Sequence, residues 1–153
     1  MASTLTPSNF NITIKEEHVI KGVKTLNESK YTISNVTNVD RRIVTVPQTT
    51  SIDLINVNGV NPGAGTFPSS SIQYVRITNL DTTSSIAVSF TSSDNGNGPS
   101  YWIMSCPPTS SVMFSDSQVT GSDFSGSFDQ NVETISIFAL DKDVDLEYVV
   151  VNS

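Results

Sequence analysis

The sequence is poor in the residues on which most metal, thiol and membrane-spanning functions depend. It has one histidine, one cysteine and one tryptophan among 153 residues: His18, Cys106 and Trp102. A single cysteine excludes an internal disulfide, and the chain has no long apolar run of the kind that forms a membrane span. Residues 1–10 lack the basic and apolar segments of a secretory signal. We therefore expect synthesis in a cytoplasm and no membrane partner.

Common catalytic motifs are also absent: the sequence contains no nucleophile elbow, Walker loop, HExxH or CxxC. His18 follows Glu16 and Glu17, but no motif places a nucleophile beside it. Cys106 has no neighbouring cation or helix start that would stabilise a thiolate. We expect a protein that is not an enzyme, with no catalytic residue, no cofactor and no metal site.

One acidic pattern leaves a calcium-binding site open as an alternative. Asp141, Asp143, Asp145 and Glu147 alternate, so a strand would place their carboxylates on one face. Such a face could bind Ca²⁺, or it could be a charged, solvated strand edge that prevents pairing with strands of other molecules. The segment with Asp94, Asn95 and Asn97 is a second, similar candidate. Neither has the glycine and frame of an EF-hand loop.

Charge argues against nucleic acid as a direct partner. The net charge is −7, and phosphate binding requires clustered Lys and Arg. The charge is unevenly distributed: residues 1–50 carry 6 basic and 4 acidic side chains, whereas residues 101–153 carry 1 and 8. The molecule is therefore expected to be electrically polar.

Composition and periodicity predict an all-β protein. The chain has 24 Ser and 17 Thr, roughly a quarter of its residues, which are poor helix formers and common in strands and turns. Apolar and polar residues alternate in short segments at intervals of about ten residues, as in a sandwich or barrel. These segments are Phe10–Ile14, Tyr31–Val36, Ile43–Val46, Ile52–Val57, Ile72–Ile77, Ile86–Phe90, Trp102–Met104, Val112–Phe114, Ile135–Leu140 and Val144–Val151. We predict an antiparallel β-sandwich of about nine strands.

Residues 1–29 differ from the rest, because charged residues interrupt a weak apolar spacing at Val19, Ile20, Val23 and Leu26. We interpret them as an N-terminal arm or a peripheral hairpin around Gly22, with residues 30–153 as the sandwich domain. A short amphipathic helix is a third reading, disfavoured by Gly22 and the β-branched residues. Residues 118–131 are predicted to form a long loop in which Phe124 and Phe128 could pack down as a lid.

The aromatic residues Tyr74, Tyr101, Trp102 and Tyr148 allow two readings: a platform for sugar rings, or filling of the core. Alternation places Tyr74 on the same strand face as Ile72 and opposite Val75. The predicted core positions are Val75, Ile77, Val88 and Ile137.

Three segments carry a family resemblance: YTISNVTNVDRRIVTVP from Tyr31 to Pro47, QYVRITNLDTT from Gln73 to Thr83, and VDLEYVVV from Val144 to Val151. They resemble small virion structural proteins of tailed phages, particularly cyanophages. The resemblance covers roughly residues 30–153 and implies a β-sandwich, plausibly of jelly-roll type, with no catalytic residues. The segment before Tyr31 takes no part in it.

The resemblance implies a protein on the capsid exterior, assembled in the host cytoplasm, that decorates or cements the capsid by binding between major capsid subunits. Its partners would be the major capsid protein or other virion proteins, and by analogy we expect a homo-oligomer, with a trimer as the guess. We expect the acidic C-terminal third to face solvent or a sister subunit. The expected capsid-facing residues are the basic ones of the first third: Lys15, Lys21, Lys24, Lys30, Arg41 and Arg42.

Two other functions stay open at this point. The first is a head-to-tail or fibre adaptor, the nearest relative of a cement protein. The second is a carbohydrate-binding module for host adhesion, which exposed coplanar aromatics would favour. A hydrolase ranks last.

Overall fold

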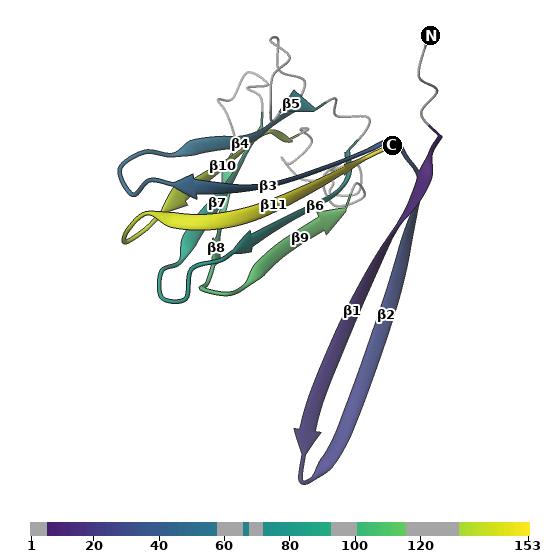
Figure 1. Ribbon diagram of the computed structural model, residues 1–153. Helices are drawn as coiled ribbons and strands as arrows, with labels where there is room; N and C mark the ends of the chain where they lie inside the picture. The colour runs from purple at the N-terminus through teal and green to yellow at the C-terminus, as the bar shows by residue number, and fades with distance from the viewer. Residues whose placement is uncertain (1–5, 58–65, 68–71, 93–100, 116–131) are drawn as a thin grey trace.

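The computed structural model describes residues 6–57, 66–67, 72–92, 101–115 and 132–153 (Figure 1). Within these ranges the chain forms strands and no helix, which confirms the predicted all-β class. The strands are β1 (Ser8–Ile20), β2 (Val23–Val36), β3 (Asn38–Val46), β4 (Ile52–Val57), β5 (Thr66–Phe67), β6 (Ile72–Asn79), β7 (Ile86–Ser92), β8 (Tyr101–Cys106), β9 (Ser111–Ser115), β10 (Val132–Ala139) and β11 (Val144–Asn152). All ten segments predicted from alternation fall on strands, except that Leu140 lies just beyond the end of β10.

Strands β3 to β11 form a sandwich of two sheets, as predicted. One sheet has the order β3-β11-β6-β9 and the other β5-β4-β10-β7-β8. Every pairing is antiparallel except that of β4 with β5. Strands β1 and β2 pair only with each other among the described residues, and they project from the sandwich as a separate ribbon (Figure 1).

The sandwich strands pair in a nested order. β7 pairs with β8, β6 with β9, β4 with β10 and β3 with β11. Apart from the short β5, each strand along the chain lies in the sheet opposite its predecessor, except at the β7 to β8 step. The body is therefore one long antiparallel hairpin, centred between β7 and β8, that folds over into two layers.

The core lies between the two sheets and is almost entirely aliphatic. The four predicted core residues are buried there: Val75 at 1% exposure and Ile77, Val88 and Ile137 at 0%. Branched aliphatic residues suit this position, because strand geometry lets them pack on both a cross-strand neighbour and the opposite sheet.

Tyr74 lies opposite the core residue Val75, as predicted, but the predicted shared face of Tyr74 and Ile72 is wrong. Ile72 packs in the core between the sheets, whereas Tyr74 packs on the outer surface of its own sheet. The cause is a β-bulge: Val151 lies opposite Tyr74 and Asn152 lies opposite Ile72, so Gln73 is an extra residue in β6. A single extra residue reverses the face of every residue before it.

Two turns are joined at one end of the sandwich. The Asn79 side chain is fully buried and donates to the carbonyls of Ser84, Cys106 and Pro107, which fixes the β6–β7 turn against the end of β8. Asp81 forms an ion pair with Lys142 in the β10–β11 turn, at 2.9 Å. Hydrogen bonds from Lys142 and from the backbone of the β6–β7 turn hold the pKa of Asp81 well below its usual range.

The described part of the chain includes no helix long and apolar enough to cross a membrane. The predicted loop over residues 118–131, with Phe124 and Phe128, lies outside the described residues. So does the candidate calcium segment with Asp94, Asn95 and Asn97.

Candidate functional site

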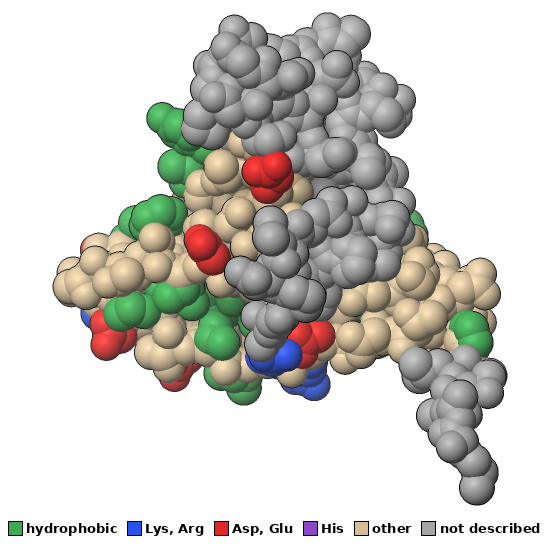
Figure 2. All heavy atoms as spheres, turned by 90° about the horizontal axis from the view of Figure 1, so that it is seen from above, with side chains coloured by type: hydrophobic (Ala, Val, Ile, Leu, Met, Phe, Trp, Pro, Cys, Tyr) green, Lys and Arg blue, Asp and Glu red, His purple; other side chains and the backbone are tan. Residues whose placement is uncertain are grey.

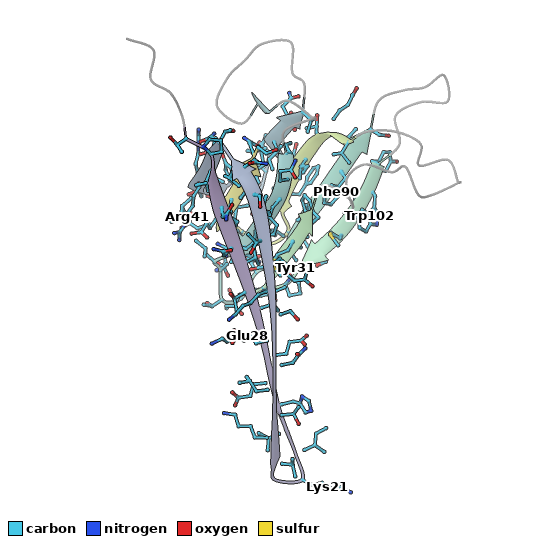
Figure 3. All side chains as sticks on the ribbon, turned by 90° about the vertical axis from the view of Figure 1, so that its right-hand side faces the viewer. Lys21, Glu28, Tyr31, Arg41, Phe90 and Trp102 are labelled. Atoms are coloured by element: carbon cyan, nitrogen blue, oxygen red, sulfur yellow. The ribbon has the colours of Figure 1, made fainter. Side chains whose placement is uncertain are left out.

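The most distinctive feature of the molecule is the arm, the hairpin of β1 and β2 over residues 8–36. Its strands are 13 and 14 residues long, so β1 spans about 40 Å at roughly 3.3 Å per residue. Both views show the distal part of the arm extending beyond the sandwich, with Lys21 at its end (Figures 1 and 3). The arm includes all of residues 8–29 and continues to Val36.

A two-residue turn closes the arm. Ile20 lies opposite Val23 in the register, and Lys21 and Gly22 between them both have positive φ, 51° and 78°. Tight hairpins favour such turns because their twist matches that of the strands, and glycine adopts positive φ without steric cost. A Cβ at Gly22 would touch nothing within 4 Å, so backbone conformation and not packing selects this glycine.

Among the described residues, the arm packs on the body at its root, defined here by Phe10, Ile12 and Ile33 next to the buried Val36. These half-buried side chains pack on the outer face of the β3-β11-β6-β9 sheet, over Tyr74, Val149 and Val151. The Phe10 and Tyr74 rings lie 6.0 Å apart between centroids. Burial raises the pKa of Tyr74. The root therefore sets the direction of the arm relative to the sandwich.

The middle of the arm, its shaft, carries paired charges. Lys15 and Lys30 both reach Glu28, at 3.4 and 2.9 Å, and Lys24 reaches Glu17 at 2.9 Å. Exposed ion pairs of this kind contribute little, about 0 to 1 kcal/mol each. They keep the shaft polar and soluble more than they stabilise it.

The tip of the arm is apolar. Its large side chains are the most exposed aliphatic ones of the arm: Val19 at 62%, Ile20 at 63%, Val23 at 67% and Leu26 at 58%. Sequence analysis noted the spacing of these four residues but gave them no role. The available signal was their grouping on either side of Gly22.

A buried ion-pair cluster lies on the same outer face. Glu147 in β11 is only 7% exposed and receives Arg41 from β3, with Nε to Oε2 at 2.7 Å, and Arg76 from β6 on its other oxygen. Burial raises the pKa of Glu147, but the two guanidinium groups outweigh it and leave that pKa below its usual range. The cluster ties three strands of one sheet together across their outer surface.

The six predicted contact residues occupy two places. Lys15, Lys21, Lys24 and Lys30 lie on the arm, and Arg41 and Arg42 lie on β3. Neighbours on a strand point to opposite faces, so the two arginines do not share a surface. Arg41 reaches Glu147 and Arg42 reaches Asp40. Five of the six are therefore ion-paired, and no described residue pairs with Lys21.

The acidic pattern near the C-terminus does not converge. Glu147 binds the arginines, Asp145 accepts from the Thr45 hydroxyl at 2.6 Å, and Asp143 accepts from the Gln48 backbone at 2.9 Å. No group of three possible metal ligands exists among the residues that the structure describes. The other two reactive side chains differ in their surroundings. His18 is exposed on the shaft opposite Thr25, and burial raises the pKa of the Cys106 thiol.

Of the four aromatic residues singled out in the sequence, two are buried and two are exposed. Tyr74 and Tyr148 are buried, whereas Tyr101 and Trp102 in β8 are 70% and 51% exposed. Trp102 stacks on Phe90 at 5.3 Å (Figure 3). Because Tyr101 and Trp102 are consecutive on a strand, they point to opposite faces and do not make one flat platform.

Comparison with models of protein families, with curated proteins and with solved structures finds no match to this chain.

Proposed function

We propose that this protein is a non-enzymatic structural subunit of a phage virion, which decorates or cements the capsid by binding between major capsid subunits. The arm is the observation that carries the proposal. Its strand β1 spans about 40 Å, it packs on the sandwich at its root among the described residues, and it ends in exposed aliphatic side chains. An isolated two-stranded ribbon is marginally stable in water, so a partner that covers it stabilises it.

The sandwich topology supports the same reading. We infer that the nested pairing of β3 with β11, β4 with β10, β6 with β9 and β7 with β8 makes the body a jelly roll. This architecture occurs in viral capsid and lectin domains, among others. Together with the resemblance of residues 30–153 to small virion proteins of tailed phages, it favours a subunit of the particle.

In this function, each copy binds the shell by burying surface against the shell subunits, and no chemical reaction is required. Each copy contributes apolar area at about 25 cal/mol per Å² before association costs, repeated over a symmetric lattice. The lysines of the shaft, Lys15 and Lys30, and Arg41 beside the root face the shell. They exchange their local carboxylate partners for those of the shell subunits.

The test is co-sedimentation of the purified protein with a panel of empty cyanophage shells, with the bound copies counted against the major capsid protein. Near-stoichiometric binding is the expected result. A few copies per shell would favour the alternative, a head-to-tail or fibre adaptor. No binding to any shell, together with a signal on a glycan array, would replace the proposal with a carbohydrate-binding module.

A further inference from the structure

The tip of the arm carries exposed aliphatic side chains on both of its faces, beside the Lys24–Glu17 ion pair on one of them. Ile20 and Val23 lie opposite each other in the register and share one face, while Val19 and Leu26 lie on the other. A ribbon that rests on a flat surface buries only one face. A tip with exposed aliphatic side chains on both faces is instead suited to insertion between groups that contact both of its sides.

The opposite end of the sandwich carries a surface that complements the tip. Leu80 and Leu140 are 43% and 52% exposed there, and their turns are joined by the ion pair of Asp81 with Lys142. Three exposed carboxylates lie in the β10–β11 turn and at the start of β11, those of Asp141, Asp143 and Asp145. None of the three has an ion-pair partner in the part of the chain that the structure describes. We call this surface the acidic end.

Charge distinguishes the arm from the rest of the chain. Residues 8–36 hold four lysines and three glutamates, a net charge of +1, whereas the remainder holds 4 basic and 12 acidic residues, a net charge of −8. On the body, Asp and Glu side chains are visible in several places, and Lys and Arg only along the lower and left edges (Figure 2). The arm ends in the unpaired Lys21, so its tip and the acidic end match in both apolar surface and charge.

We propose that the tip of the arm docks on the acidic end of a second copy of this chain, with Val19, Ile20, Val23 and Leu26 against Leu80 and Leu140 and with Lys21 among the carboxylates. This inference deepens the proposed function, because it rests on the arm being an assembly element. The shaft lysines stay available for the shell while the tip holds the neighbouring copy.

The geometry makes this contact head to tail. The root packs at Tyr74 and Val151, near the C-terminal end of β11, whereas the acidic end lies in the turn before Val144 at the start of the same strand. In Figure 1 the β6–β7 and β10–β11 turns lie at the left and the arm leaves at the right. Such an interface joins two different surfaces, so it closes into a ring where the rotation permits and otherwise forms a filament.

The test uses the full chain and two variants in size-exclusion chromatography with light scattering. The tip variant carries Ile20→Ser and Val23→Ser, and the end variant carries Leu80→Ser and Leu140→Ser. Wild type is expected to form a closed oligomer, and each variant is expected to raise the Kd of self-association about tenfold or more. A control with Tyr101→Ser and Ile103→Ser removes exposed apolar side chains from β8, at 70% and 54% exposure, and is expected to assemble as wild type does.

Mixing the two variants is the decisive step. Each retains one intact surface, so the mixture is expected to form a one-to-one pair, and added salt is expected to weaken it. A monomeric wild type, a tip variant that assembles normally, or a mixture that forms no pair would each overturn the inference. Shell co-sedimentation of the same samples separates the two proposals: a monomer that binds shells overturns only this one, and an oligomer that ignores shells overturns only the proposed function.

Discussion

The Phe10 ring of the arm packs against the Tyr74 ring of the sheet, with centroids 6.0 Å apart and planes inclined by 38°. This contact, with Ile12 and Ile33 beside it, is the apolar connection between arm and sandwich. The direction of a long projecting ribbon thus depends on a few side chains at one end. Alternation from the core residue Val75 turns Tyr74 outward, and the bulge at Gln73 returns Ile72 to the core.

Phe10→Ala is expected to release the arm and leave the sandwich folded. The ring is half-buried, so its loss removes about 1 to 2 kcal/mol of root packing. Amide hydrogen exchange should become faster in β1 and β2 and stay unchanged in β6 and β11. Val19→Ala at the exposed tip serves as the control and should leave the root protected. Unchanged exchange in the arm of Phe10→Ala would contradict the role given to this contact.

Ile77→Ala and Ile137→Ala are each expected to lower the free energy of unfolding by about 2 to 5 kcal/mol, because both side chains are fully buried between the sheets. Ile43→Ala changes a side chain that is 66% exposed and should cost less than about 0.5 kcal/mol. Urea denaturation measures all three. Equal losses in the core and surface variants would refute the assignment of strand faces.

The Glu147 cluster predicts an acid-dependent part of the stability. The pKa of Glu147 is lowered in the folded state, so its contribution is present above the unfolded pKa and is lost as pH falls through the folded pKa. Glu147→Gln lacks this contribution and leaves Arg41 and Arg76 facing each other. The difference in Tm between wild type and variant should therefore shrink as pH falls from about 7 to about 3. A constant difference over that range would show that the carboxylate charge contributes nothing.

The turn at the tip predicts opposite effects at neighbouring positions. Gly22→Ala puts a Cβ on a residue with φ of 78°, which costs about 1 kcal/mol, so amides of the tip should exchange faster. Lys21→Asn places a residue that tolerates positive φ before the glycine and should protect the tip at least as well as the native turn. If both variants behave alike, the turn does not have the conformation described.

Much of the sandwich could be predicted from the sequence, because burial of one strand face produces the alternation that marks a strand. Val75, Ile77, Val88 and Ile137 all stand in such patterns, and all are core residues. The face of Ile72 relative to Tyr74 could not be predicted, because no residue in β6 marks the bulge that Gln73 forms.

The arm was harder to predict for a related reason. Beyond its root it has no buried face, so alternation between apolar and polar residues disappears and charged pairs such as Lys24 with Glu17 take its place. A hairpin around Gly22 was one of the readings that remained open, but the role of Val19 and Leu26 depends on exposure, which the sequence does not give. Glu147 was grouped with its acidic neighbours, since pairing with Arg41 and Arg76 depends on long-range strand order.

The most direct measurement of the central claim is shell binding by a shortened arm. Residues 13–30 are replaced by an Asn-Gly turn, so that Ile12 and Tyr31, which are partners in the register, flank the new turn; the root is kept and the shell-facing Lys15 and Lys30 are removed. The account predicts that this variant keeps the Tm of the sandwich and loses co-sedimentation with empty shells that wild type retains. Binding of the shortened variant at the wild-type level would contradict the assignment of the arm as the element through which this protein assembles.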